Sequence, residues 1–197
     1  MTAADTARLI LVRHGESEGN RDRTFTQHTE VPITSLGREQ AQAAAARIRR
    51  RFAPAQIIAS PFARARQTAE IVAAPFGLAV AIEPAFREQS FGVFAGQRYE
   101  ALLADAAYHE GPRWVWRPQG GESLVDVYDR VVPTFEEVAR RGLGRDTIIV
   151  SHGGVMLALN AFVVGSWDGL TVAPNAGVLL VEYRAGRYAA PVTVDDD

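Results

Sequence analysis

The chain has 197 residues, of which 47% are hydrophobic, and a formal net charge of −2. This length and apolar content suit one well-buried domain over residues 1–197 and are short for two. All 21 basic residues are arginine and there is no cysteine, which excludes disulfides, thiolate zinc sites, cysteine nucleophiles, Schiff-base lysines and the lysine of a Walker A loop.

The composition also limits the location and the partners of the protein. A small negative net charge gives no reason to expect nucleic acid, which calls for a basic patch. Residues 1–12 have no cationic start and only a short apolar run, unlike a signal peptide. No apolar run approaches the about 20 residues that span a bilayer. We therefore expect a soluble cytoplasmic protein with no nucleic-acid or membrane partner.

Strand-like and helical patterns alternate along the chain, which is typical of a layered α/β domain. Short apolar runs predict strands over residues 8–12, 56–59, 79–82, 146–150, 177–183 and 188–194. Apolar residues at helical spacing predict helices over residues 35–52, 60–76, 99–109, 123–141 and 155–164. Ser60 is expected to cap the second of these helices, with Pro61 in its first turn.

Reactive or cationic side chains stand after three of the predicted strands. Arg13 and His14 follow the first strand, Arg64 follows the second, and His152 follows the strand over residues 146–150. Ligands of open α/β sheets bind outside the carboxyl ends of the strands. If these strands are parallel neighbours, we expect the four side chains to meet in one crevice.

Two helix starts supply further groups that suit an anion. Arg64 lies near a helix N-terminus, where a cation costs about 0.3–1 kcal/mol unless an anion is held between the two. The backbone amides of Gly153 and Gly154 begin another helix and can donate to phosphate oxygens. On these residues alone, an Arg64 that points into solvent and a His152 that is a satisfied core histidine remain alternatives.

Five segments, in order, resemble the motifs of the histidine phosphatase superfamily, the phosphoglycerate mutase-like group. They are Leu11-Val12-Arg13-His14-Gly15-Glu16-Ser17, Ser60-Pro61-Phe62-Ala63-Arg64-Ala65, Arg87-Glu88-Gln89-Ser90-Phe91-Gly92, Gly120-Gly121-Glu122-Ser123 and Val150-Ser151-His152-Gly153-Gly154. A further segment, residues 31–37, is also similar to the family. The resemblance spans about residues 8–183 and implies a three-layer α/β/α sandwich with a mostly parallel central sheet.

The resemblance also implies a role for each matching residue. His14 is the nucleophile that accepts the phosphoryl group, and Glu88 is the proton donor. Arg13, Arg64 and His152 surround the phosphate. Further phosphate- or substrate-binding groups are expected at Ser17, Asn20, Thr26 and Gly153. No cofactor and no metal are expected, and His28 and His109 fit no metal-ligand spacing with the other histidines.

These roles have physical reasons. A histidine nucleophile must be neutral, and neighbouring arginines disfavour a second positive charge on His14. Phosphoryl transfer asks mainly for positioning and charge stabilisation, for which arginine is well suited. An alkoxide is a poor leaving group, so an acid such as Glu88 must protonate it. The same carboxylate can then take a proton from the water that hydrolyses phosphohistidine.

Phosphatases and mutases share the phosphohistidine step and differ afterwards. The segment between Glu88 and His152 is short, holds only scattered arginines, and carries aromatic residues that include Tyr99, Trp114 and Trp116. This favours a phosphatase with a partly apolar substrate rim. Mutase-type phosphoryl transfer is the alternative, and a non-catalytic phosphate-binding domain is a third reading that the intact set of site residues argues against.

Substrate choice and assembly are the least constrained features. Thr26 and Gln27 stand where members of the family vary with substrate, and Phe94-Ala95 replaces the more usual Trp-Glu before Gly96. The expected partner is a small phosphorylated metabolite. A homodimer formed through an exposed strand or helix is an open alternative.

Overall fold

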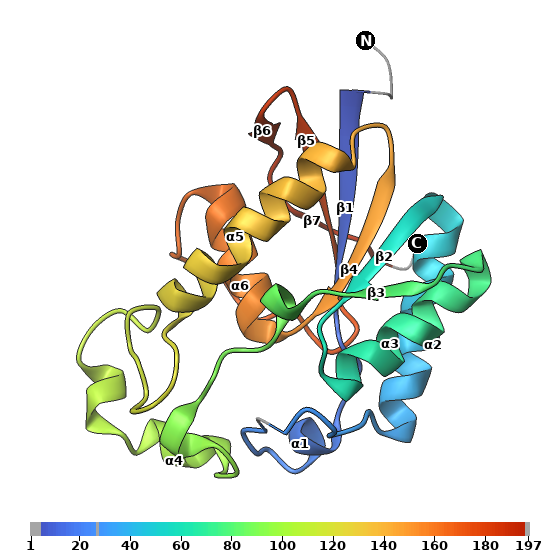
Figure 1. Cartoon of the computed structure of the whole chain (residues 1–197). Helices are drawn as coiled ribbons and strands as arrows, with labels where there is room; N and C mark the ends of the chain where they lie inside the picture. The colour runs from blue at the N-terminus through green and yellow to red at the C-terminus, as the bar shows by residue number, and fades with distance from the viewer. Residues whose placement is uncertain (1–4, 27, 196–197) are drawn as a thin grey trace.

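The computed structural model describes residues 5–26 and 28–195, so Gln27, one of the two positions expected to vary with substrate, lies outside the described residues. A seven-stranded sheet in the order β3-β2-β4-β1-β5-β6, with β7 also paired to β5, forms the centre of the fold (Figure 1). Its strands are β1 (Thr6–Arg13), β2 (Pro54–Ala59), β3 (Val80–Ile82), β4 (Asp146–Ser151), β5 (Val178–Arg184), β6 (Arg187–Tyr188) and β7 (Val192–Thr193).

The neighbouring strands β3, β2, β4 and β1 are parallel, and β5 runs antiparallel to β1. In this register Ala59, Val150 and Val12 lie side by side near the carboxyl ends of β2, β4 and β1. The predicted mostly parallel sheet is therefore confirmed. Its register brings the three segments that follow these strands to one edge of the sheet.

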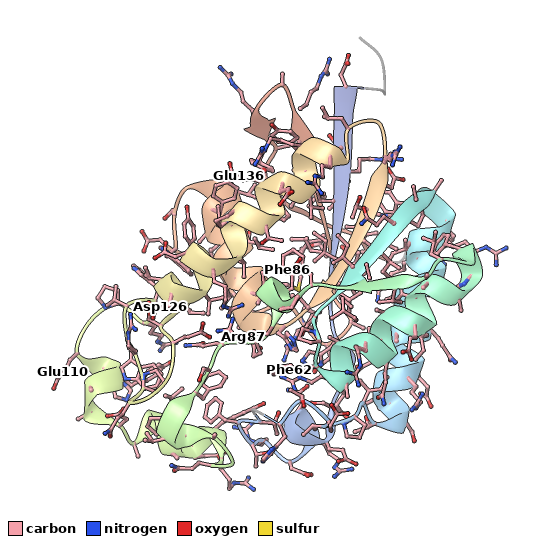
Figure 2. All side chains as sticks on the ribbon, in the orientation of Figure 1. Phe62, Phe86, Arg87, Glu110, Asp126 and Glu136 are labelled. Carbon is pink, nitrogen blue, oxygen red and sulfur yellow. The ribbon has the colours of Figure 1, made fainter. Side chains whose placement is uncertain are left out.

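Two pairs of helices cover the two faces of the sheet (Figure 1). They are α2 (Ser35–Arg51) and α3 (Ala63–Ala73) on one face, and α5 (Leu124–Arg141) and α6 (Gly153–Val164) on the other. The first pair packs a core that includes Ile48 and Val72, and the second a core that includes Phe135 and the fully buried Phe86, in the middle of the view in Figure 2. The fold is thus the expected three-layer sandwich. No helix in the described part of the chain is long and apolar enough to cross a membrane.

Short helical elements connect the longer helices and strands. They are α1 (Glu18–Arg21), α4 (Tyr99–Leu103) and the 3-10 turns η2 (Ala74–Phe76), η3 (Pro84–Phe86), η4 (Gly92–Phe94) and η5 (Ala106–His109). The single helix predicted over residues 99–109 is wrong. Asp105 interrupts it, because its side chain accepts a hydrogen bond from the Ala107 N–H and starts a new turn.

Two other sequence-based predictions need correction. Ser60 does not cap α3, which starts at Ala63 with Phe62 as the flanking residue and no side-chain cap; the Ser60 hydroxyl instead contacts His152 at 2.6 Å. The strand predicted over residues 188–194 is divided into β6 and β7. Pro191 lies between the two, and a proline has no N–H to continue a strand ladder.

Candidate active site

Four segments of the chain deliver polar side chains to the same edge of the sheet. Arg13 and His14 lie at the end of β1, Arg64 in the first turn of α3, Glu88 after η3, and His152 between β4 and α6. The rings of His14 and His152 meet edge to face with centroids 5.2 Å apart. Arg13, His14, Arg64 and Glu88 line one cavity. The five side chains that the sequence predicted as catalytic are therefore neighbours in space.

One ring nitrogen of His14 offers a lone pair to this cavity. Nδ1 lies 2.7 Å from the carbonyl oxygen of Gly15, which can only accept, so Nδ1 carries the proton. The Nε–H of Arg64 donates to Nε2 at 3.3 Å. Burial first, and then the charges of Arg64 and Arg13, hold the pKa of His14 well below its usual 6.5. The imidazole is therefore neutral at pH 7, as a nucleophile requires.

Three buried ring or guanidinium nitrogens around His14 have no hydrogen-bond partner within the described residues. They are Arg13 Nε, Arg64 Nη1 and His152 Nδ1. Arg13 is nevertheless held in place, because its Nη1 donates to the carbonyl oxygen of Ala173 at 2.7 Å. Buried polar groups are almost always hydrogen-bonded, so nitrogens without partners around one nucleophile mark the place of an anion with several oxygens.

His152 is oriented by Ser60 and by the aromatic ring of Phe62. Ser60 Oγ accepts from the Phe62 N–H at 3.3 Å and lies 2.6 Å from His152 Nε2, where its hydroxyl donates or accepts according to the tautomer of the ring. In the tautomer in which Ser60 donates to Nε2, Nδ1 carries the ring proton. Burial, followed by the charge of Arg64, lowers the pKa of His152 well below its usual 6.5. His152 is thus neutral, and in that tautomer its Nδ1–H, which has no partner within the described residues, is available to an anion.

Glu88 faces the same cavity in a dry environment. Its Oε1 accepts hydrogen bonds from the backbone N–H groups of Gln89 at 2.9 Å and Gly154 at 3.1 Å. Burial raises the pKa of Glu88 above its usual 4.5, although these two hydrogen bonds and the charges of Arg64 and Arg13 act against the rise. The carboxyl group is therefore shifted toward the protonated form that a general acid needs.

The other predicted binding residues line the same cavity but are used differently. The Ser17 hydroxyl caps α1, where it accepts from the Asn20 N–H. One N–H of the Asn20 side-chain amide donates to the hydroxyl of Tyr99 at 3.2 Å, and its second N–H is left for the predicted contact with phosphate. Thr26 lies on the wall, and Gly153 begins α6 beside the Arg13 guanidinium.

The cavity continues outward from the arginines and has a volume of about 930 Å³. Its outer walls come from α4, from residues 108–116 and from the segment after α6 that contains residues 167–172. The wall side chains are largely aromatic and aliphatic, as the predicted substrate rim required. Within residues 5–26 and 28–195, no three His, Asp or Glu side chains are grouped as a metal site.

Comparison with known proteins identifies the family. The sequence profile of the histidine phosphatase superfamily (branch 1) matches residues 9–196. The chain belongs to the histidine phosphatase superfamily. The predicted family and its fold are thus confirmed.

Relatives of this histidine phosphatase are phosphomonoester hydrolases, which confirms the predicted reaction class. The chain is 36% identical to a glucosyl-3-phosphoglycerate phosphatase of Mycolicibacterium vanbaalenii over 86% of this chain and 81% of the relative. It is 32% identical to phosphoserine phosphatase 1 of Hydrogenobacter thermophilus over 80% and 76%. A mycobacterial glucosyl-3-phosphoglycerate phosphatase solved with inorganic phosphate superposes with a TM-score of 0.83 at 28% identity, covering 96% of this chain and 98% of that one.

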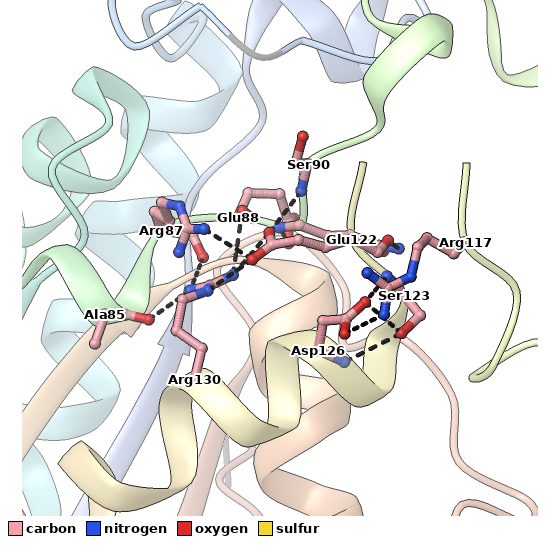
Figure 3. Close-up of polar contacts among 10 residues, drawn as sticks. Ala85, Arg87, Glu88, Ser90, Arg117, Glu122, Ser123, Asp126 and Arg130 are labelled. Carbon is pink, nitrogen blue, oxygen red and sulfur yellow. Dashed lines mark hydrogen bonds and ion pairs between the residues drawn. The ribbon is translucent and has the colours of Figure 1, made fainter. Parts of the chain in front are cut away.

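The sequence analysis of this histidine phosphatase missed the residues that hold Glu88 in place (Figure 3). Arg130, on α5, donates to the carbonyl oxygens of Ala85 at 2.6 Å and Arg87 at 3.0 Å. Glu122 accepts from Arg130, from Arg87 and from the Ser90 N–H. Glu122 lies in one of the quoted motifs, so its position was visible in the sequence. Its partner Arg130 was not, because it is one arginine among several on a helix.

Asn175 is a second residue that the sequence analysis did not single out. Its side-chain amide donates to the carbonyl oxygen of His14 at 3.2 Å and to Asn20 Oδ1 at 3.0 Å. The segment before β5 is thereby tied to both the nucleophile and α1. No motif in the sequence marks this position, because the contact joins residues that are 161 apart in the chain.

Proposed function

We propose that this histidine phosphatase hydrolyses a small phosphorylated metabolite through a phosphohistidine intermediate on His14, without a metal ion. The observation that carries the proposal is the neutral His14, with its Nε2 lone pair among buried nitrogens that have no partner within the described residues. Arginines and neutral imidazole N–H groups supply the charge stabilisation that phosphoryl transfer needs. A cytoplasmic location belongs to the same proposal, because charged phosphorylated metabolites are held inside cells.

In the first step, the Arg64 Nε–H gives up its hydrogen bond to His14 Nε2. The freed Nε2 lone pair attacks phosphorus, and the bond from phosphorus to the ester oxygen breaks. Arg13, Arg64, His152 and the Gly153 amide hold the phosphoryl oxygens. Glu88, protonated, gives its proton to the departing alkoxide, which leaves as a neutral alcohol. The His14 proton stays on Nδ1, which donates a hydrogen bond to the Gly15 carbonyl oxygen.

In the second step, water attacks the phosphohistidine and the bond from nitrogen to phosphorus breaks. Glu88, now a carboxylate, takes a proton from that water and so returns to its starting state. Inorganic phosphate leaves, and the Nε2 lone pair is restored. The sum of the two steps is one ester and one water converted to one alcohol and one phosphate.

Steady-state hydrolysis of 4-nitrophenyl phosphate in the presence of a chelator tests this proposal. His14→Ala should reduce kcat by about three orders of magnitude or more, as expected when a nucleophile is removed. His28→Ala, which replaces an exposed histidine, is the matched control and should retain full activity. Substantial activity in His14→Ala, or loss of activity with the chelator that Mg²⁺ restores, would contradict the proposal.

A second assay on the same purified protein distinguishes mutase-type transfer from hydrolysis. With 2,3-bisphosphoglycerate and 3-phosphoglycerate, a phosphatase releases inorganic phosphate, whereas a mutase passes the phosphoryl group between hydroxyls without net release. A chain that binds inorganic phosphate but neither forms an adduct nor turns over any ester would be the non-catalytic alternative.

A further inference from the structure

Charged groups are concentrated at the inner end of the cavity and are almost absent from its outer part. Of the residues that line it, Arg13, Arg64 and Glu88 surround the phosphate position described above. Only Arg113 and Asp168 carry charge farther out. These two have opposite signs, so the outer cavity has no net charge to attract a second anionic group of a substrate.

The outer walls are apolar and partly open to solvent. The indole rings of Trp114 and Trp167, which both line the cavity, stack nearly parallel with centroids 6.1 Å apart. Leu103 and Val172, on different segments of the wall, are 58% and 50% exposed. Apolar side chains gathered around a concave site and left open to water mark a surface that a ligand covers.

From these observations we propose that the outer cavity binds a bulky apolar, ring-bearing alcohol moiety with no second anionic group. This inference rests on the proposed phosphatase function and defines the class of its substrate. The cavity, at about 930 Å³, lies at the upper end of the range for small-molecule sites. It has room for such a body beyond the phosphate.

Arg113 is exposed, so water and salt screen its attraction for a carboxylate. Its guanidinium carbon lies 5.5 Å from the centroid of the Tyr108 ring, a cation–π contact. Two relatives carry names that specify carboxylate-bearing substrates, glucosyl-3-phosphoglycerate and phosphoserine. The outer cavity of this chain has the chemistry of a different substrate.

Binding of three phosphonates, measured by calorimetry, tests the inference without relying on turnover. The first two compounds are ethylphosphonate and 2-cyclohexylethylphosphonate. The third is 2-cyclohexylethylphosphonate that carries a carboxylate on its ring. All three present the same phosphoryl-like group. We expect the cyclohexyl compound to bind at least about tenfold more tightly than the ethyl compound, because burial of a ring of this size removes much apolar surface from water. The added carboxylate should weaken binding about tenfold.

Variants of the wall identify where the ring binds. Trp114→Ala should reduce the affinity ratio of the cyclohexyl and ethyl compounds by about tenfold, and Leu103→Ala by about threefold, in proportion to the apolar surface removed. Leu103 is exposed, so its replacement keeps the test available if Trp114→Ala folds poorly. Leu143→Ala replaces another exposed leucine, outside the cavity, and should leave the ratio unchanged.

The outcomes separate this inference from the function on which it rests. A cyclohexyl-to-ethyl affinity ratio below two, or tighter binding of the carboxylated compound that Arg113→Gln abolishes, would overturn the inference while ethyl phosphate is still hydrolysed. Failure of every phosphonate to bind, together with no hydrolysis of ethyl phosphate, would overturn the proposed function and this inference with it.

Discussion

Two titratable residues with pKa values shifted in opposite directions face the phosphate position. Burial and the arginine charges lower the pKa of His14 below 6.5, and burial raises the pKa of Glu88 above 4.5. In the first step His14 must be unprotonated and Glu88 protonated. With ordinary pKa values, no pH would place most molecules in that state. Both shifts raise the fraction of molecules in that state.

As the pH is raised, kcat/KM should therefore first increase as His14 loses its proton, with a midpoint below 6.5. It should then decrease as Glu88 loses its proton, with a midpoint above 4.5. Glu88→Gln should remove the alkaline limb. It should also slow alkyl esters by about 10²–10³-fold and aryl esters much less, because a phenolate leaves without a proton. Ionisation of the phosphate ester affects the pH profiles of both proteins equally, so a difference between the two profiles on the same substrate comes from residue 88. An alkaline limb that survives in Glu88→Gln, or equal slowing of both ester types, would contradict the acid role.

At the scale of elements, the first turn of α6 leaves space for the Glu88 carboxylate and donates a hydrogen bond to it. A Cβ added to Gly154 would lie 2.7 Å from Glu88 Oε1, so only glycine leaves room for the carboxylate at this position. Alanine is otherwise the better helix former by about 1 kcal/mol. Glycine at this position therefore favours the contact with Glu88 over helix propensity.

Gly154→Ala should separate activity from stability. We expect kcat for alkyl esters to fall more than about tenfold, since displacement of a catalytic group by a fraction of an ångström weakens positioning strongly. The free energy of unfolding, measured with urea, should be unchanged or slightly higher. Activity equal to that of the unmodified protein would show that Glu88 does not need this backbone contact.

The network of Glu122 with Arg130 connects α5 to the segment that carries Glu88. Burial alone would raise the pKa of Glu122, but hydrogen bonds from Arg130 and the Ser90 N–H and the charges of Arg130 and Arg87 bring it below its usual 4.5. Both side chains of the Glu122–Arg130 pair are mostly buried. A carboxylate with a lowered pKa in the folded chain stabilises it fully above the pKa of the unfolded chain, and this stabilisation is lost as the pH falls through the folded-state value.

Glu122→Gln should therefore lower the free energy of unfolding by about 1–3 kcal/mol at pH 7. The difference between the two proteins should shrink as the pH is lowered below 4.5, because Glu122 itself then becomes neutral. Urea unfolding at a series of pH values measures both effects. A difference that stays constant with pH would show that the charge of Glu122 is not what stabilises the network.

The sequence predicted the elements that repeat a simple pattern and the residues that sit in motifs. Strands, buried helices and the placement of Arg13, His14 and His152 follow from apolar periodicity and from the rule that sites lie at strand ends. Ser60, Asn175 and Arg130 could not be assigned in the same way. Each acts through a partner far away in the sequence, so its role depends on tertiary packing that local pattern does not contain.

At the scale of the whole molecule, the site lies where three buried parallel strands end and two helices begin. Arg64 is 3% exposed on α3 and has a nitrogen without a partner within the described residues. Burial of these donors without a hydrogen-bond partner lowers the free energy of unfolding. An anion that satisfies them should therefore stabilise the entire chain.

Inorganic phosphate should raise the thermal unfolding midpoint, and a concentration of 100 times its Kd should add about 2.7 kcal/mol to the free energy of unfolding. Arg64→Met should lose most of this increment. Arg66→Met, on the same helix but facing Glu30 at the surface, should keep it. Sodium chloride of equal ionic strength controls for screening. An equal increment in both variants would place the phosphate elsewhere.

The covalent state of His14 during turnover is the most direct test of the whole account. A rapid acid-free quench after a brief pulse with a phosphomonoester, followed by intact mass and ³¹P NMR, should find one acid-labile phosphoryl group on His14. It should be attached at Nε2, since Nδ1 is occupied by its hydrogen bond to Gly15. His14→Ala should give none. Turnover without such an adduct, or an adduct that persists in His14→Ala, would contradict the account.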